Sequence, residues 1–458
     1  MSTYPIPRIM LAAPNSGAGK TTLTCALLQA LVNRGLSAAS FKCGPDYIDP
    51  MFHSKIIGIK SRNLDLFFLK SDTVRALLYK TAVQADIAVL EGVMGYYDGV
   101  GGTTTQASSY ELARETKTPV VLVVNCGGMS LSLAALIKGF LQFREDSGIC
   151  GVILNRVSPM LYPSLKKALE EELGIAVLGY LPPLPECSLQ SRHLGLVTAN
   201  EVEHLKEKLN RLAAQLEHTM DFGRLIRIAQ DAPPLSCEPI DLPNLPNGHP
   251  KIAVAMDNAF CFYYQDSLDL LEELGAQLVP FSPLNDAQLP PKINGLILGG
   301  GYPELYAEAL SENYSMRGSI KAAIHGGMPC IAECGGFMYL HKSMQDDTGT
   351  VHDMAGVIDA DCYKTDHLRR FGYVTLTARR DNMLCKAGEN IAAHEFHYWD
   401  STDCGDAFQA QKPVRNTTWN CIYGGSNLNI FAGYPHFHFY SNPRFAVRFI
   451  RKCNEFEI

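Results

Sequence analysis

The sequence has 458 residues, too many for one ordinary domain, so we expect two or three domains. Hydrophobic residues make up 47% of it and charged residues 19%, which is typical of a globular protein with ample apolar side chains for its cores. A net charge of −7 and the lack of any basic run predict no nucleic-acid partner, although a local basic cluster could hold a polyanionic substrate.

Targeting signals and disulfides are not expected from the sequence. The opening residues MSTYPIPRIMLAAP have neither the charged head nor the apolar run of a secretion signal, and no apolar stretch approaches the roughly 18 residues of a membrane span. The fourteen cysteines include no CxxC pair, which predicts neither a zinc site nor a disulfide framework. We therefore expect a cytoplasmic protein without a membrane partner, with most cysteines buried as small apolar residues.

Short apolar runs alternate with helix-length segments in the first half of the chain. Strands are predicted for the runs RIMLAA, SAASF, DIAVLEG, PVVLVVN and GVILNRV. This alternation predicts an α/β fold, in which a mostly parallel sheet has helices on both faces. A charged segment at 201–229 predicts one further helix.

A proline-rich stretch divides the chain. Residues 231–250 contain six prolines and little periodicity, as in a linker between domains. A second series of α/β runs follows, from KIAVAMD to NIFAGYPHFHF. We predict an N-terminal domain over 1–235, a linker over 236–250 and a C-terminal domain over 251–458.

Residues 8–28 form a strand, a glycine-containing loop and a helix in that order. In such a loop the backbone N–H groups point at phosphate oxygens, and the helix N-terminus adds favourable partial charge. Lys20 would reach the outer phosphates and Thr21 would bind Mg²⁺. Pro14 replaces the first glycine of the GxxxxGK[ST] pattern but leaves the phosphate cradle. We predict ATP or GTP binding by Ser16, Gly17, Ala18, Gly19, Lys20, Thr21 and Thr22.

Two acidic loops, FKCGPDYIDP and VLEGVMGYYDGV, follow at the ends of predicted strands. Carboxylates at the C-terminal ends of parallel strands face the ligand crevice of an open α/β sheet. Their hard oxygen atoms suit a Mg²⁺ ion that bridges nucleotide phosphates. The candidate acids are Asp46, Asp49, Glu91 and Asp98.

In the second domain, PCIAECGGFMYL places Cys334 between a short strand and a helix. Such a sharp turn exposes a nucleophile, and a helix N-terminus stabilises a thiolate. Gly335 and the glycine-rich run that contains Gly300 and Gly301 would let a carbonyl oxygen approach backbone N–H groups, which predicts an oxyanion site. His436 or His438, about 100 residues later, would supply the base.

These segments together resemble a known family. The second domain resembles the class I glutamine amidotransferases, and the whole chain resembles the cobyrinic acid a,c-diamide synthase family of corrinoid amidoligases. The matching landmarks, in order, are SGAGKTT, FKCGPDYIDP, SRNLD, EGVMGYYDG, SRHLGLV, GGGYPE, AECGGFMYL, AHEFHYWD and YPHFHFYSNP. The resemblance implies two doubly wound α/β domains, a P-loop domain like that of dethiobiotin synthetase and a class I glutaminase domain.

The resemblance also implies a reaction in two sites. Glutamine is hydrolysed in the C-terminal domain, and ammonia passes inside the protein to the N-terminal domain. There ATP with Mg²⁺ phosphorylates an acetate carboxylate of the macrocycle, and ammonia displaces the phosphate to leave an amide. Release of ammonia beside the acyl phosphate avoids its dilution and protonation. The reaction runs twice, at the c and a positions.

Site roles are carried over from the family as expectations. Metal binding is expected of Thr21, Asp46, Asp49 and Glu91, and Asp98 is expected to assist phosphoryl transfer or substrate binding. Lys42 would steady the transferring phosphate, and Asn155 would either recognise adenine or cap a strand end. The expected contacts of the macrocycle and its carboxylates are Tyr47, Ile48, Arg62, Arg192 and Arg369.

The glutaminase residues depart from the class I pattern at one position. Many class I enzymes have His-x-Glu, in which the acid orients the imidazole, whereas this chain has His436-Phe437-His438. We therefore expect Cys334 and His436 to work as a dyad, with a slower or substrate-gated glutaminase. The pair His394 and His397 is expected to be structural and not to bind metal.

Other readings stay open at this stage. The same loops would serve an amidoligase for Ni-sirohydrochlorin or hydrogenobyrinic acid. A more distant alternative is a partition-type P-loop ATPase, but those proteins carry a lysine where this chain has Asn15, and they need no thiol glutaminase. The sequence does not determine the oligomeric state, and a homodimer is among the states we consider.

Overall fold

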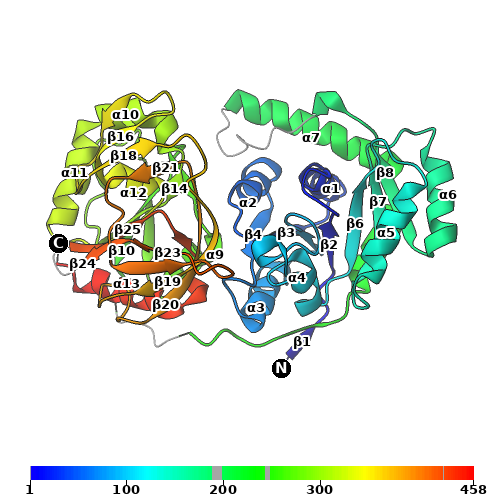
Figure 1. The fold of residues 1–458 in the computed structure, drawn as a ribbon, viewed down its shortest axis with the longest axis horizontal. Coiled ribbons are helices and arrows are strands. Elements are labelled where there is room, and N and C mark those ends of the chain that lie inside the picture. Colours follow the sequence, from blue (N-terminus) through cyan, green and yellow to red (C-terminus); the bar gives the residue numbers. More distant parts are fainter. Residues whose placement is uncertain (1, 188–198, 243–247, 426–427, 458) are drawn as a thin grey trace. The chain divides into compact units, whose positions relative to one another are not determined.

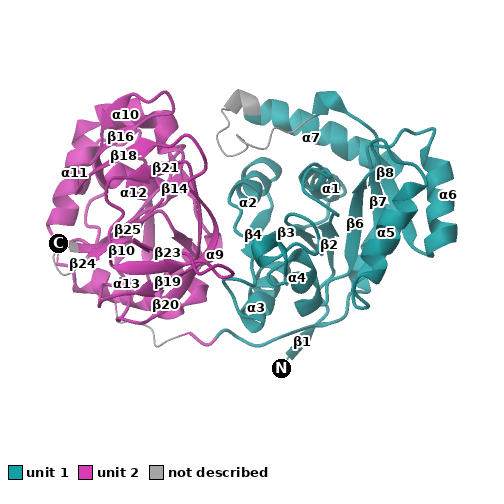
Figure 2. Ribbon diagram, in the orientation of Figure 1, with its two compact units in different colours: residues 1–240 teal, residues 241–458 magenta. Residues whose placement is uncertain are grey.

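The computed structural model describes residues 2–187, 199–242, 248–425 and 428–457. The chain divides into two compact units, residues 1–240 and 241–458 (Figure 2). Each unit is built around its own mainly parallel sheet. In the described part of the chain, none of the helices has the length and apolarity to cross a membrane.

The first unit contains a seven-stranded sheet in which all neighbouring strands are parallel (Figure 1). Apolar runs without polar alternation are typical of parallel strands buried on both faces. The strands lie in the order β4 (Lys60–Leu64), β3 (Ala38–Cys43), β5 (Ile87–Glu91), β2 (Arg8–Ala12), β6 (Val120–Asn125), β7 (Ile149–Asn155) and β8 (Ala176–Leu181). The predicted α/β class is confirmed.

Helices cover both faces of this sheet. One face packs against α1 (Lys20–Asn33), α7 (Ala199–Thr219) and α8 (Phe222–Gln230). The helices that follow β4, β5, β6 and β7 are α3 (Ser71–Ala82), α4 (Ser109–Glu115), α5 (Ser132–Gln142) and α6 (Tyr162–Leu173). The short α2 (Ile48–Phe52) lies between β3 and β4.

The prediction of a single helix over 201–229 is wrong, because the structure has two helices there. The chain breaks at Met220 and Asp221, between α7 and α8. Asp221 Oδ1 accepts a 2.9 Å hydrogen bond from the backbone N–H of Arg224, and this N-cap starts α8. The amphipathic pattern continues across the break because both helices bury their apolar side chains in the same core.

The start of the predicted linker is also structured. β1 (Ser2–Tyr4) pairs antiparallel with β9 (Leu235–Cys237), so residues 236 and 237 belong to the first unit. The buried Arg8 guanidinium donates to the carbonyl oxygens of Thr116 and Pro233, which holds this end of the unit in place.

The second unit has a six-stranded sheet in which only the last pair is antiparallel. The order is β12 (Gln277–Phe281), β10 (Lys251–Ala255), β13 (Gly295–Leu298), β15 (Cys330–Glu333), β25 (Leu428–Gly433) and β24 (Tyr423–Gly425). The helices of this unit are α9 (Gln265–Glu273), α10 (Ala307–Glu312), α11 (Tyr314–His325), α12 (Gly335–Leu340) and α13 (Pro443–Glu455).

Smaller sheets that the sequence did not predict complete the second unit. One contains β17 (Val351–Asp353), β16 (His341–Gln345), β18 (Ile358–Lys364) and β21 (Trp399–Ser401). Another contains β23 (Thr418–Cys421), β22 (Phe408–Gln411), β19 (Arg370–Ala378), β20 (Asn390–His397) and β26 (His436–Phe437). A two-stranded pair joins β11 (Phe260–Phe262) to β14 (Gly300–Gly301).

Candidate active site

The phosphate loop lies between β2 and α1. Gly19 has φ 97°, a conformation that favours glycine, and α1 begins at the next residue. Lys20 Nζ donates to the carbonyl oxygen of Met94, at 2.6 Å, and to that of Asn15, at 3.3 Å. Burial, with the nearby charge of Lys42, lowers the pKa of Lys20 to about 8. The lysine therefore spans the phosphate loop and the loop after β5.

Asn155, at the end of β7, supports the same loop. Its amide Nδ2 donates a 2.8 Å hydrogen bond to the carbonyl oxygen of Ala18, and the side chain is buried. A Cβ atom on Gly19 would overlap this amide group. The sequence left adenine recognition and strand capping open for Asn155, and the structure shows its amide holding the phosphate loop. Ser16 and Gly17 are exposed, and Thr22 is half-buried.

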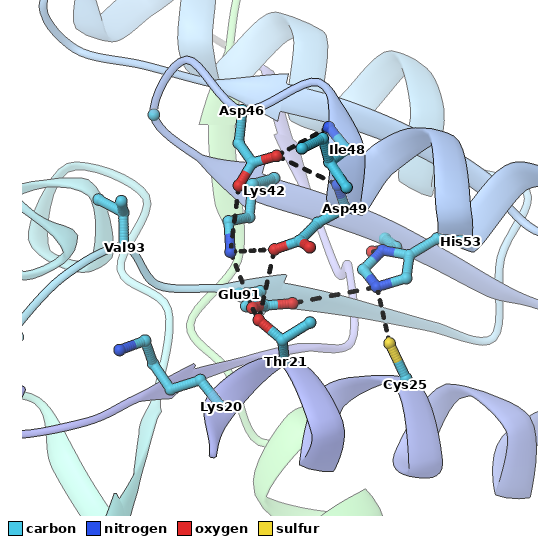
Figure 3. Close-up of polar contacts among 12 residues, drawn as sticks. Lys20, Thr21, Cys25, Lys42, Asp46, Ile48, Asp49, His53, Glu91 and Val93 are labelled. Atoms are coloured by element: carbon cyan, nitrogen blue, oxygen red, sulfur yellow. Dashed lines mark hydrogen bonds and ion pairs between the residues drawn. The ribbon is translucent and has the colours of Figure 1, made fainter. Parts of the chain in front are cut away.

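A buried charge cluster lies beside the phosphate loop (Figure 3). Lys42 Nζ donates to Asp49 Oδ2 at 2.5 Å and to Glu91 Oε1 at 2.8 Å. Burial raises the pKa of Glu91 to about 7, and the charge of Asp49 adds to this. Burial acts the same way on Asp49, but the charge of Lys42 and its hydrogen bond hold the pKa of Asp49 below its usual value. The lysine is thus the counter-charge for two carboxylates.

Thr21 and the two carboxylates are the groups that could hold Mg²⁺. Thr21 Oγ1 donates to Glu91 Oε1 at 2.6 Å and lies 3.4 Å from Asp49 Oδ2. Glu91 Oε2 is buried without a hydrogen-bond partner among the described residues, and His53 Nε2 lies 3.9 Å from it, so it could accept a metal ion. This all-oxygen set fits Mg²⁺, which takes one or two protein carboxylates beside substrate phosphates.

The structure does not join all the predicted metal ligands into one group. Asp46 Oδ1 accepts from the N–H groups of Ile48 and Asp49, at 2.9 and 3.1 Å, and so caps α2. Asp46 Oδ2 is 3.9 Å from Lys42 Nζ, and burial raises the pKa of Asp46 to about 6. Among the described residues, no three His, Cys, Asp or Glu side chains are grouped as a metal site.

The other substrate candidates have separate positions. Tyr47 and Ile48, both half-buried, stand at the start of α2. Arg62 lies on β4 and donates to the carbonyl oxygen of Ser61. Asp98 Oδ2 accepts a 2.9 Å hydrogen bond from Gly95 N–H and adds to the negative potential around Lys20. Arg192 lies outside the described residues.

Cys334 stands at a sharp turn between β15 and α12 in the second unit. Its φ of 47° and ψ of −101° are unusual for a residue with a side chain, and the backbone N–H donates 2.7 Å to Gly433 O on β25. This conformation is the strained turn that presents a nucleophile at the edge of a sheet. The thiol side chain is mostly buried.

The predicted oxyanion glycines surround this turn. A Cβ atom on Gly335 would lie 3.2 Å from Gly301 N, so the two backbones are adjacent. Gly336 N–H donates to Gly299 O, and Gly299 N–H donates to the hydroxyl of Tyr263, both at 2.9 Å. A Cβ atom on Gly300 would overlap the His436 ring. Glycine is therefore required where the loop meets the catalytic elements.

His436 reaches Cys334 and a carboxylate that the sequence analysis missed. Its Nδ1 lies 3.2 Å from Glu333 Oε2, and its ring also hydrogen-bonds the Cys334 side chain. Burial acts to lower the pKa of His436, but these two groups raise it to about 10. The structure therefore places a carboxylate beside the pair for which the sequence predicted none. Glu333 escaped notice because it precedes the cysteine instead of following the histidine.

His438 does not take the acid's place. Its ring is buried against Tyr264, with ring centroids 5.1 Å apart, and Nδ1 accepts a hydrogen bond from the backbone N–H of Tyr440. Burial lowers the pKa of His438 to about 3, so the ring is neutral. The geometry gives it a packing and capping role.

The histidines of AHEFHYWD are also buried on β20. His397 stacks on Tyr434 at 3.9 Å, and its Nδ1 lies 2.6 Å from Trp399 O. His394 pairs in register with His436 across the sheet. Arg369, expected to grip a substrate carboxylate, makes a 2.5 Å ion pair with Asp400 in the second unit.

Comparisons with known proteins agree with this two-unit arrangement. A family model described as the CobQ/CobB/MinD/ParA nucleotide binding domain matches residues 9–196, and a CobB/CobQ-like glutamine amidotransferase domain matches 251–444. A cobyrinate a,c-diamide synthase of Caldanaerobacter subterraneus subsp. tengcongensis is 42% identical over 450 residues, which cover 98% of both chains. This chain belongs to the cobyrinate a,c-diamide synthase family.

Two further members of the family support the assignment. Proteins of the same name from Listeria innocua and Priestia megaterium are 41% and 39% identical and cover 96% and 97% of this chain. The alignments cover 98% and 97% of those proteins. The resemblance that the sequence predicted is confirmed, and so is the class of enzyme, a glutamine-dependent amidotransferase ligase.

Supporting residues of the family's nucleotide-binding unit also escaped the sequence analysis. Asn63, within SRNLD, donates to Gly44 O at 2.9 Å and Asp46 O at 2.6 Å, and so holds the acidic loop. His53 Nε2 lies 3.9 Å from Glu91 Oε2 (Figure 3). Its Nδ1 is 2.9 Å from Ser40 Oγ. Asn63 lies within a matched segment and His53 three residues after one, but neither has a spacing pattern that points to its contacts.

Proposed function

We propose that this chain catalyses the ATP-dependent amidation of the a- and c-acetate carboxylates of cobyrinic acid with ammonia from glutamine. The observation that carries the proposal is the similarity over nearly the whole chain to proteins named cobyrinate a,c-diamide synthase. The geometry supports it, because one chain holds a phosphate loop beside buried carboxylates and a Cys–His pair beside a glycine-rich loop.

In the first unit, we propose that the backbone of the phosphate loop and Lys20 hold the ATP phosphates. When bound, Mg²⁺ would neutralise phosphate charge, held by Thr21, Asp49 and Glu91. A carboxylate is a poor electrophile at neutral pH, so transfer of the γ-phosphoryl group to the substrate acetate creates an acyl phosphate with a good leaving group. Lys42 would offset the negative charge around the transferred group.

In the second unit, we propose that Cys334 Sγ attacks the side-chain amide carbon of glutamine. His436, whose pKa Cys334 and Glu333 raise, holds the thiol proton before the attack and gives it to the departing ammonia. Backbone N–H groups around Gly335, Gly300 and Gly301 stabilise the oxyanion. Water then attacks the resulting thioester, with His436 as the base, to release glutamate and the free thiol.

The identity of the macrocycle is the part that needs a direct test. Purified protein with ATP, Mg²⁺ and glutamine would be incubated separately with cobyrinic acid, hydrogenobyrinic acid and Ni-sirohydrochlorin. Mass spectrometry of each product would count the carboxylates converted to amides. We expect two amidations of cobyrinic acid. Two amidations of either rival and none of cobyrinic acid would reject the substrate assignment while leaving the amidoligase chemistry.

A further inference from the structure

Sheet topology brings Glu333 and His436 to one point in the second unit. β15 and β25 are parallel neighbours, and Glu333 pairs in register with Gly433 at their C-terminal ends. Cys334 follows directly on the first strand, and His436 comes three residues after Gly433 on the second. The nucleophile, its carboxylate neighbour and the imidazole therefore meet at one edge of the sheet.

The contact between Glu333 and His436 determines which imidazole nitrogen faces the thiol. His436 Nδ1 lies 3.2 Å from Glu333 Oε2, and the side chains expose only 4% and 15% of their surface. The same imidazole hydrogen-bonds the Cys334 side chain. A carboxylate that accepts a hydrogen bond from Nδ1–H orients the imidazole and keeps the proton on Nδ1, so Nε2 is the nitrogen left to exchange a proton with sulfur.

Other groups near His436 do not fill this role. His438 is neutral and packs on Tyr264, as described above. Glu395 lies next to His394 on β20, and His394 pairs with His436, so alternation directs the Glu395 side chain to the opposite face of that strand. Burial raises the pKa of Glu395 to about 7, and burial keeps His394 and His397 neutral at neutral pH.

Tyr263 lies near Glu333 but does not occupy its carboxylate. The phenol hydroxyl donates to Ala255 O and accepts from Gly299 N–H, which uses its one proton. Glu333 thus keeps the capacity to accept from His436.

We infer that Glu333 is the carboxylate partner of the catalytic pair, a positioning residue that acts through His436 on Cys334. The inference rests on the proposed glutaminase activity and adds Glu333 as a third residue to the pair of Cys334 and His436. Glu333 occupies the position before the nucleophile, so the carboxylate reaches Nδ1 from the nucleophile's own strand. The residue two places after the histidine, where many class I enzymes have glutamate, is then released for packing.

The test compares Glu333→Gln, Glu333→Asp and the matched control Glu395→Gln, which changes a neighbouring buried glutamate on the other face. Glutamine hydrolysis by the full-length protein would be followed as kcat/KM across pH. ATP-dependent amidation with ammonia would report on the first unit, and circular dichroism would report on folding. We expect Glu333→Gln to lose roughly 10- to 100-fold in glutaminase kcat, since the imidazole loses the carboxylate that orients it and stabilises its charge.

The pH profile separates positioning from simple packing. The Glu333 charge raises the pKa of His436, so its loss should move the basic limb of kcat/KM to lower pH. Glu333→Asp should recover part of the rate. Glu395→Gln, whose charge acts on His436 only from the other face of β20, should change the rate and the limb much less than Glu333→Gln. An equal loss in Glu395→Gln, or an unmoved limb in Glu333→Gln, would overturn the inference. Absence of glutaminase activity in the unsubstituted protein would instead reject the proposed function.

Discussion

Thr21 Oγ1 donates a hydrogen bond of 2.6 Å to Glu91 Oε1, and so joins the first turn of α1 to the end of β5. The same carboxylate oxygen accepts from Lys42 Nζ at 2.8 Å. One buried oxygen therefore links the helix of the phosphate loop to the lysine on β3. Because the oxygen is buried, a change in Lys42 should be felt at Thr21, the residue after the phosphate-loop lysine.

Lys42→Met should both unfold the first unit more easily and abolish amidation. The substitution leaves Asp49 and Glu91 buried without their counter-charge, which should cost about 3 kcal/mol or more of unfolding free energy. Urea denaturation measures the loss. Lys55→Met removes an exposed lysine from the same region and is the control. If Lys42→Met lowers the free energy of unfolding by less than about 1 kcal/mol, the two carboxylates do not depend on Lys42 as their counter-charge.

Gly19→Ala should destabilise the protein more than Gly17→Ala. Both glycines have positive φ, but a Cβ atom on Gly17 meets nothing within 4 Å, whereas one on Gly19 overlaps Asn155. We expect about 1 kcal/mol for Gly17→Ala and about 2 kcal/mol or more for Gly19→Ala. In an Asn155→Ala background the extra cost of Gly19→Ala should disappear, and thermal or urea denaturation would show it. Equal costs in both backgrounds would rule out the clash.

Cys334→Gly should be more stable than Cys334→Ala, the reverse of the usual order. The φ of 47° and ψ of −101° strain any residue with a Cβ atom, and glycine relieves this strain by about 1 kcal/mol. Thermal unfolding compares the two variants. An alanine variant as stable as the glycine variant would mean that the turn stores no strain.

Cys334→Ser should lose glutamine-dependent amidation and keep ammonia-dependent amidation, because the thiol serves only the release of ammonia. The measurement is amide formation with each nitrogen donor in the presence of ATP. Loss of both activities, in protein that remains folded by circular dichroism, would contradict separate sites for the two half-reactions.

His438→Gln should become relatively more stable as the pH falls. Burial holds the pKa of His438 at about 3, below its unfolded value of 6.5, so the unfolded chain takes up a proton first. The stability that the neutral ring contributes is present above about pH 6.5 and decreases by about 1.4 kcal/mol per pH unit below it. Urea denaturation at about pH 7 and pH 5 tests this; a pH-independent difference between the proteins would show that the ring is not buried in its neutral form.

Local sequence carried most of the fold, because parallel strands buried on both faces are continuous apolar runs. The phosphate loop could also be predicted, because its glycines, lysine and threonine are contiguous in the sequence. The antiparallel strands around β19 and β20 were not predicted, because polar residues alternate with apolar ones along them and no continuous apolar run marks the strand. Glu333 and Asn63 act through space, on His436 and on the loop of Asp46, and sequence spacing does not encode such contacts.

The two helices after the nucleotide-binding match set a limit on how the units can be recombined. Apolar side chains of α7 and α8, such as Leu212 and Leu225, share one core with Leu27 of α1. The matched region ends at residue 196, before both helices. A fragment that ends at residue 196 would lack α7 and α8 and expose the apolar face of α1 that they cover, so we expect it to aggregate. Exchange of glutaminase modules between amidoligases, in evolution or in the laboratory, should therefore join the chains after residue 240.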